Sequence, residues 1–263
     1  MTQSNIIFEV SDHIGKVTLN RPDLKNALNP DLMAELGAVI KTVSEDKQIR
    51  VLIVTGAGDA FSGGGDVNRL LEDRKKSSSE IREFLKKLYG GGALSLRTLE
   101  IPVIGAINGA AVGAGFELLL HCDFRIAADT AKMGPIWARI STIPALGGMF
   151  LLPRIVGLGR ATQMMMLGEV IDAAEAYRIG LVNSVVPKND LESASLDLAR
   201  RLARGASAAI SIIKNGINRG LDGTLMNEID YAIYMQSICM KMEDCEEGIR
   251  AFKEKRKPQF KGR

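Results

Sequence analysis

One stretch, residues 103–123 (VIGAINGAAVGAGFELLLHCD), constrains strongly how this chain can fold. It begins with an apolar run typical of a buried strand, Val103 to Ile107. It then passes through a turn with three glycines into an apolar run of helical character, Phe116 to His121. Glycines at such a junction let the backbone approach a ligand closely, because no Cβ intervenes. The first N–H groups of the helix lack internal partners and lie at the positive end of its dipole. The stretch therefore predicts a site for an oxyanion or a phosphate.

Glu117 is the informative polar residue of this stretch. We expect it in the first turn of a helix made otherwise of Ala, Phe and Leu. It follows Ala114 by three residues, so its side chain and the Ala114 N–H share one helix face. Two interpretations stay open at this point. Glu117 is either a first-turn acid that interacts with the helix dipole, worth less than ~1 kcal/mol, or a catalytic base.

A dinucleotide-binding turn is not favoured. That motif requires G-x-G-x-x-G, and Gly113 and Gly115 are followed by Leu118 where the third glycine should stand. There is also no clean acidic residue at the end of a second strand about 20 residues later, as the motif requires.

Composition narrows the class of protein. The chain has 263 residues, 46% hydrophobic and 25% charged, which is enough for a sizeable core. A net charge of +3, from 34 basic and 31 acidic residues, is too balanced to imply nucleic acid as the main partner. The three cysteines show no CxxC, which fits a reducing compartment, and two histidines are too few for a histidine-based metal site. Without a secretory signal or a run of about 18 apolar residues, we expect a cytoplasmic protein with no membrane span.

The rest of the chain alternates strands and helices and then becomes helical only. Asn29 followed by Pro30 predicts a helix start, because a side-chain cap precedes proline at the first helical position. A capping box, Asp244 with Glu247 three residues on, predicts the start of the last helix. The order predicts an α/β core, residues 1–190, followed by a helical region, residues 191–263. We expect strands at residues 6–10, 16–19, 51–55, 103–107, 124–128 and 181–186, and helices in the second region at residues 191–203, 207–218 and 225–242.

Three segments allow two interpretations each. The glycine-rich residues 56–66 form a flexible surface loop or a functional loop that presents its backbone N–H groups. Residues 70–92, charged and serine-rich, form a lid on the substrate side or a solvated helix. The methionines and isoleucines of residues 226–242 pack against another subunit or into the core of their own chain.

Five segments, taken together and in this order, resemble the enoyl-CoA hydratase/isomerase family, the crotonases, over nearly the whole chain. The resemblance implies a crotonase-like spiral of ββα units with a C-terminal α-helical trimerisation region, and a homotrimer or a homohexamer built as a dimer of trimers. It implies an acyl-CoA thioester as substrate, a place in fatty acid metabolism, and no separate cofactor, because coenzyme A is part of the substrate. The segments are LNRPDLKNALN (19–29), VLIVTGAGDAFSGGGDV (51–67), IPVIGAINGAAVGAGFELLLHCD (101–123), IDAAEAYRIGLVNSVVP (171–187) and GIRAFKEKRKPQF (248–260).

The family shares an oxyanion hole of two backbone N–H groups, which the resemblance places at Gly65 and Ala114. The family usually has glycine at the second place, but alanine also supplies an N–H. Two such donors stabilise the enolate of a thioester, and the loss of one costs roughly 3–4 kcal/mol of barrier in other enzymes. Glu117 stands where the first of the two hydratase glutamates is expected, and it would move a proton near the acyl Cα or Cβ.

The chain departs from the hydratase pattern at the second glutamate, whose position holds Trp137. No Asp or Glu occurs in residues 131–168. In the family two carboxylates normally hold and split the attacking water, so this departure bears directly on hydration. Trp137 either narrows the acyl pocket, for a ring-bearing or branched acyl group, or is a large apolar filler.

The resemblance also implies contacts with coenzyme A. They fall at Lys25, along Ser62, Gly63, Gly64, Asp66 and Val67, and at Phe252 and Lys255, which in the family often reach coenzyme A on a neighbouring subunit. Each has a structural alternative, such as a solvated Lys25, a helix-capping Asp66, a core Phe252 or a helix-terminal Lys255.

Hydration of a 2-enoyl-CoA is the first expectation for function. A single-base enoyl-CoA isomerase or another crotonase-type reaction, and a non-catalytic acyl-CoA-binding protein, are the alternatives. RNA binding occurs in some members of the family, but no basic stripe with interleaved aromatic residues supports it here.

Overall fold

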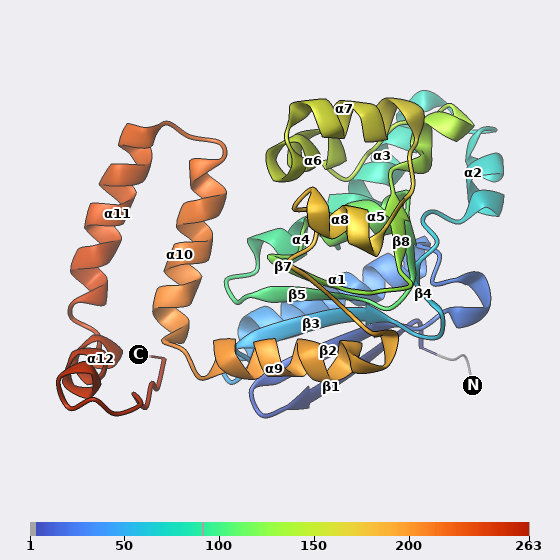
Figure 1. The fold of residues 1–263 in the computed structure, drawn as a ribbon. Coiled ribbons are helices and arrows are strands. Elements are labelled where there is room, and N and C mark those ends of the chain that lie inside the picture. Colours follow the sequence, from blue (N-terminus) through green and yellow to red (C-terminus); the bar gives the residue numbers. More distant parts are fainter. Residues whose placement is uncertain (1–3, 91, 263) are drawn as a thin grey trace.

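A large and a small β-sheet form the centre of the computed structural model, which describes residues 4–90 and 92–262, without the side chains of residues 68 and 87–90 (Figure 1). The large sheet has six strands in the order β1-β2-β3-β5-β7-β10, parallel except for the β1–β2 hairpin. Its strands are β1 (Ile6–Ser11), β2 (Ile14–Leu19), β3 (Val51–Gly56), β5 (Val103–Ile107), β7 (Phe124–Ala128) and β10 (Ser184–Val186).

The small sheet has four strands in the order β4-β6-β8-β9. Three of them run parallel, and β9 pairs antiparallel with β8. They are β4 (Ala60–Ser62), β6 (Ala110–Val112), β8 (Lys132–Gly134) and β9 (Ile171–Asp172).

The two sheets are built by one repeated unit. A strand of the large sheet is followed by a strand of the small sheet and then by helix, as in β3–β4–α2, β5–β6–α5 and β7–β8–α6. Successive units lie close, since a Cβ added at Gly109, in the β5–β6 turn, would lie 1.9 Å from the Asp59 carbonyl oxygen in the β3–β4 turn. This arrangement confirms the predicted spiral of ββα units. The helices are α2 (Val67–Asp73), α5 (Ala114–Leu120) and α6 (Gly148–Val156).

The local signals that predicted the first elements are confirmed. Asp12 and His13 form the β1–β2 turn with φ angles of 49° and 66°. Helix α1 (Pro30–Glu45) begins with proline, and the Asn29 side chain accepts a hydrogen bond from the Leu32 N–H.

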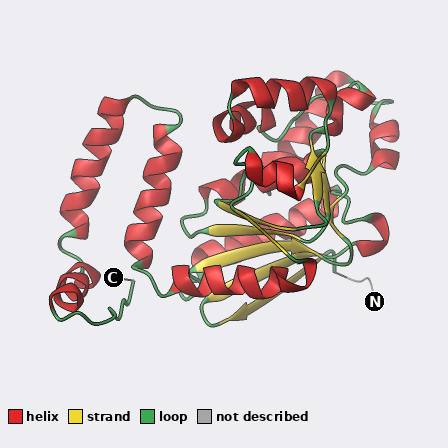
Figure 2. Cartoon of the chain, in the orientation of Figure 1, coloured by secondary structure: helices red, strands yellow, loops and turns green. Residues whose placement is uncertain are grey.

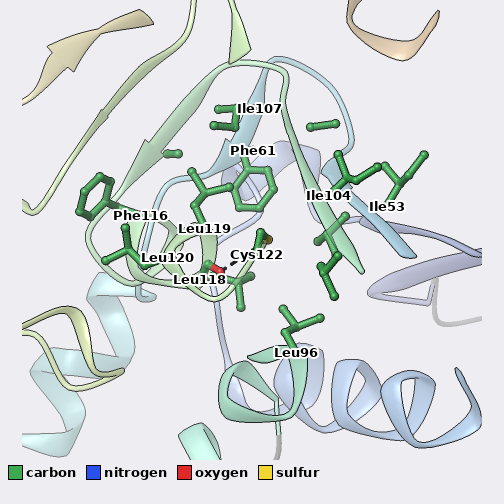
Figure 3. Packing of buried hydrophobic residues seen from close by; sticks show 14 of the residues in the cluster. Ile53, Phe61, Leu96, Ile104, Ile107, Phe116, Leu118, Leu119, Leu120 and Cys122 are labelled. Carbon is green, nitrogen blue, oxygen red and sulfur yellow. Dashed lines mark hydrogen bonds between the residues drawn. The ribbon is translucent and has the colours of Figure 1, made fainter. Parts of the chain in front are cut away.

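The hydrophobic core surrounds α5. Every residue of this helix is buried, Glu117 included. Figure 3 shows Leu118 and Leu119 packed with Ile104 of β5 and Phe61 of β4. The same view shows Leu96 of α4 (Ala93–Thr98) below them. The helix that carries the informative carboxylate is therefore held by apolar contacts from both sheets and from neighbouring helices.

The C-terminal helices divide into two groups. Helix α9 (Leu191–Ala203) packs against β3, β5 and β7 of the large sheet. Helices α10 (Ser207–Gly220), α11 (Leu225–Cys239) and α12 (Glu243–Lys253) form an arm to one side of the sheets, which Figure 2 shows clearly.

The predicted capping box of the last helix is wrong. Met242 is the N-cap residue of α12, and Asp244 lies inside the helix. The Asp244 carboxylate instead accepts hydrogen bonds from the N–H groups of Lys261 and Gly262, and Glu247 binds Arg256. Both acids are used by the C-terminal segment, which folds back on α12.

The segment predicted as a lid, residues 70–92, contains the end of α2 and α3 (Ser78–Gly90). Its predicted helical character is confirmed up to Gly90, and Gly91 lies outside the described residues. A role as a lid stays a prediction.

The arm is fixed to the core by an ion pair whose lysine is buried and whose aspartate is partly buried, which gives a first prediction. Lys214 Nζ of α10 lies 2.7 Å from Asp123 Oδ2 and donates to the Ile101 carbonyl at 2.9 Å. Burial lowers the pKa of Lys214, and Asp123 opposes that shift. Lys214→Met would leave Asp123 without its cation, so we expect a loss of about 2–4 kcal/mol in the free energy of unfolding by denaturant titration.

The matched control is Lys47→Met. Lys47 Nζ lies 4.0 Å from Glu100 on the surface, where both side chains are largely exposed. We expect a change below about 0.5 kcal/mol. Equal effects of the two substitutions would contradict the anchoring role of Lys214.

Candidate active site

The carboxylate of Glu117 lies in a frame of three backbone N–H groups. Oε1 accepts from Leu146 at 3.0 Å and from Gly148 at 2.9 Å, and Oε2 accepts from Ala145 at 3.3 Å. The residue is 1% exposed. Ala145 and Leu146 lie in the loop that leads into α6, and Gly148 is the first residue of that helix. Residues 28 to 31 positions further along the chain therefore fix the position of this carboxylate.

Burial and hydrogen bonding act on the pKa of Glu117 in opposite directions. Burial, the larger effect, raises the pKa above the ordinary 4.5, because the charged form loses its hydration. The N–H groups of Gly148, Leu146 and Ala145 and the indole of Trp137 oppose the shift. A carboxyl group whose pKa moves toward neutrality is better suited to take and return a proton than an exposed one.

The loop after β4 lies directly against the turn that begins α5. A Cβ added at Gly64 would lie 2.8 Å from the Val112 carbonyl oxygen and 3.5 Å from the Ala114 nitrogen. Gly64 also has a φ of 97°, a conformation that side chains disfavour. Glycine at this position is therefore what lets the loop pack beside Ala114.

Both predicted oxyanion donors have free N–H groups. Gly65 lies opposite Leu28 in an isolated β-bridge, but the hydrogen bonds of this bridge are made by the residues on either side of Gly65. The Gly64 carbonyl accepts from the Leu28 N–H, and the Asp66 N–H donates to the Leu28 carbonyl. Ala114 is the first residue of α5, so its N–H has no partner in the helix. Throughout the described part of the chain, neither N–H meets an acceptor.

The small sheet brings these positions together. Gly65, Ala114 and Trp137 each follow a short parallel strand, β4, β6 and β8 in turn, by two or three residues. These strands are neighbours in the sheet, so their carboxyl ends lie along one edge. Ligand sites form preferentially at such an edge.

Trp137 lies beside this edge in a 3-10 helix, Ile136–Ile140. It is 7% exposed, and a Cβ added at Gly113 would lie 3.6 Å from its Cζ2 atom. Within the described residues, its Nε1 has no acceptor at hydrogen-bonding distance, yet the indole lies close enough to lower the pKa of Glu117. The tryptophan thus lies close to both the α5 turn and the carboxylate.

Hydrogen bonds order the glycine-rich loop, residues 56–66. The fully buried Asn26 side chain donates to the carbonyls of Ala57 and Ala60. The Ser62 hydroxyl donates to the Asn26 carbonyl and accepts from the Gly64 N–H. The loop is therefore an ordered, built structure. No pattern in the sequence around Asn26 signals this role, so it is not among the predicted site residues.

The other positions implied for coenzyme A lie in two places. Lys25 is exposed, and its carbonyl accepts from the Gly63 N–H at 2.7 Å, so it borders the same loop. Asp66 caps α2 by accepting from the Arg69 N–H, as its structural alternative predicts, and Val67 is exposed.

Phe252 and Lys255 are not brought to Glu117 within one chain. Phe252 is 86% exposed on α12, and Lys255 is exposed just beyond that helix. Figure 1 places α12 at the far end of the arm, well away from α5.

Neither a metal-binding cluster nor a membrane-spanning helix is found among the described residues. No group of three or more His, Cys, Asp and Glu side chains there is placed to hold a metal ion. No helix among them is long and apolar enough to cross a membrane.

Comparisons with known proteins point to one family. The family described as enoyl-CoA hydratase/isomerase matches residues 9–263. A "Crotonyl-CoA hydratase" of Syntrophomonas wolfei is 37% identical over 271 residues, with 99% of each chain covered. A "1,2-epoxyphenylacetyl-CoA isomerase" of Escherichia coli is 35% identical, with 98% of each covered. The crystal structure of an enoyl-CoA hydratase from Bacillus anthracis matches with a TM-score of 0.92 and 35% identity, over 98% of this chain and 100% of that one.

The frame around Glu117 gives a second prediction. A Cβ added at Gly148 would lie 2.7 Å from Glu117 Oε1, so Gly148→Ala must displace the carboxylate or the loop. We expect a loss of about 1–3 kcal/mol in the free energy of unfolding, as for other overpacked sites. A crystal structure of the variant should show the Glu117 carboxylate moved from the Gly148 N–H.

Gly159→Ala is the control. Gly159 lies in α7 (Leu158–Leu167), and a Cβ there meets nothing within 4 Å. The free energy of unfolding of Gly159→Ala should equal that of the parent or exceed it by up to ~1 kcal/mol. If Gly148→Ala were as stable as this control, the close fit at Glu117 would be refuted.

Proposed function

Because this chain belongs to the enoyl-CoA hydratase/isomerase family, we propose that Glu117 moves a proton on an acyl-CoA thioester whose enolate is held by the Gly65 and Ala114 N–H groups. The observation that carries the proposal is the buried, framed carboxylate three residues after a free helix-terminal N–H. A base, a fixed geometry and two unused donors are the parts that enolate chemistry needs.

The proposed reaction uses the edge of the small sheet. The thioester oxygen accepts hydrogen bonds from Gly65 and Ala114, and negative charge moves onto it when the acyl group becomes an enolate. Preset donors stabilise this charge without reorganisation. Glu117, on the same helix face as Ala114, exchanges a proton with the acyl Cα or Cβ or with an attacking water.

Hydration of a 2-enoyl-CoA is the first candidate reaction. The oxygen of water joins Cβ and a proton joins Cα, with Glu117 as the acid/base group. The relatives named as hydratases support this choice. Glu117 would have to manage the water without the second carboxylate of the usual hydratase pair.

A single-base isomerase is the second candidate. Trp137 stands where a second carboxylate is expected and offers an indole N–H in its place. One carboxylate can take a proton from one carbon and return it to another, which shifts the double bond without adding water. A relative named as an isomerase agrees with this reaction. A non-catalytic acyl-CoA-binding protein remains the alternative if no substrate turns over.

We further propose that the arm joins subunits into a homotrimer or a homohexamer. Helix α11 has no buried residue, so packing into its own core does not account for its apolar face. Phe252 and Lys255 would then reach coenzyme A bound to a neighbouring subunit, while Lys25 and residues 62–67 bind it within their own chain. The exposed apolar residues of α11 are Leu225, Met226, Ile229, Ile233, Tyr234 and Ile238.

Glu117→Gln tests the catalytic proposal. The glutamine oxygen can keep the hydrogen bonds from Leu146 and Gly148, which both reach Oε1, and only the longer bond from Ala145 to Oε2 is lost. We expect the variant to fold and to bind acyl-CoA but to lose at least about 10²-fold in kcat, since general acid–base catalysis contributes this much.

The assay is mass spectrometry in heavy water with straight, branched, cyclic and aromatic enoyl-CoA thioesters. Addition of water that Glu117→Gln abolishes would identify a hydratase. Deuterium exchange or a moved double bond without added water would identify the isomerase. Full activity in Glu117→Gln would refute the role of Glu117, and binding without turnover of any substrate would favour the binding protein.

Ile233→Glu tests the proposed assembly. Ile233 is 65% exposed on α11, and a charge there should oppose burial between subunits. By light scattering we expect the parent to be a trimer or a hexamer and the variant to shift toward the monomer. Val10→Glu, at a 49% exposed position of β1, is the control and should keep the parent mass. A monomeric parent protein would rule the assembly out.

A further inference from the structure

His121 and Glu117 bind the same loop residue, Leu146: Glu117 binds its N–H group, and His121 binds its carbonyl group. The Leu146 N–H donates to Glu117 Oε1 at 3.0 Å, and the Leu146 carbonyl oxygen lies 2.7 Å from His121 Nε2. Glu117 lies in the first turn of α5, and His121, four residues on, directly follows the last residue of that helix, so the two side chains lie on one side of it. A single residue of the loop is thus bound at both of its backbone groups.

The contact defines the state of the histidine. A carbonyl oxygen only accepts, so Nε2 carries the hydrogen and donates it. Nδ1 has no partner within the described residues. Burial lowers the pKa of His121, and Arg97 of α4 adds to this effect, whereas the bond to Leu146 opposes it. His121 is therefore a neutral donor whose bond does not depend on the charge of Glu117.

The loop has few other attachments. In the described chain, the backbone hydrogen bonds of residues 143–146 go only to Glu117 and His121. Ile143 is 69% exposed, and Leu146 is the buried side chain of this segment. If Glu117 alone held the loop, the hydrogen bonds from the loop N–H groups to its carboxyl group would weaken each time that group is protonated, because a neutral acid is a weaker acceptor.

We propose that His121 is a positioning residue that keeps the N–H groups of Leu146 and Gly148 aimed at Glu117 while Glu117 gains and loses its proton. The inference rests on the proposed acid/base role of Glu117 and extends it. Preorganised donors are effective because they need no rearrangement during the reaction. The hydrogen bond from His121 would keep the N–H groups of Leu146 and Gly148 in place when Glu117 is protonated and attracts them less.

The test compares His121→Gln with His121→Met. The two side chains are alike in length, and only glutamine can donate a hydrogen bond to the Leu146 carbonyl. We expect His121→Gln to keep kcat within about threefold of the parent. We expect His121→Met to lose about tenfold to a hundredfold in kcat, as misplacement by about 1 Å does elsewhere.

The pH profile separates positioning from packing. The frame lowers the pKa of Glu117, so a loosened frame should raise it. The acidic limb of kcat/KM should therefore move to higher pH in His121→Met and stay in place in His121→Gln. Equal impairment of the two variants, or a His121→Met variant like the parent in rate and profile, would overturn the proposal.

Two further measurements stand apart from activity. Amide hydrogen exchange at Leu146 and Gly148 should be faster in His121→Met than in His121→Gln, and equal rates would overturn the proposal even if Glu117 proved not to be catalytic. Should His121→Met fail to fold, nitrogen NMR of the parent decides. A neutral ring protonated at Nε2 supports the proposal, and a ring protonated at Nδ1 refutes it.

Discussion

The placement of one carboxylate in the middle of the apolar core is the constraint on which the rest of the structure depends. A buried charge without partners is too costly to keep, and here three backbone N–H groups offset part of that cost at Glu117. Such donors are N–H groups that no helix or strand uses for its own hydrogen bonds. The loop before α6 and the first residue of that helix, Gly148, supply them, and Gly148 also leaves the space that the carboxylate fills.

The repeated ββα unit explains why the site forms where it does. In each unit the short strand of the small sheet ends at the same edge, and the residues that follow it lie there. Gly65 follows β4, Ala114 and Glu117 follow β6, and Trp137 follows β8. In the proposed reaction, three successive turns of one spiral would thus supply the two donors, the base and the residue that stands in the place of a second base.

Much of this could be predicted from sequence, and the misses have physical reasons. The long strands, the Asn29 cap and the glycines near Ala114 carry local signals, and the structure agrees with them. The strands β4, β6 and β8 have three residues each, too few for a periodic pattern, and long-range pairing forms them. The capping box at Asp244 failed because the acid binds residues 17 and 18 positions further on. No sequence pattern marks His121, since only the fold reveals that Leu146 lies beside it.

Trp137 changes the electrostatics of the site as well as its shape. A second carboxylate near Glu117 would raise its pKa further, and the two groups would titrate as a coupled pair. The indole N–H lowers the pKa instead and brings no charge of its own. With Trp137 in that place, Glu117 is not coupled to a second carboxylate there. In the proposed reaction every proton would pass through one carboxyl group, so the N–H groups that fix this group would matter more than in a site with two carboxylates.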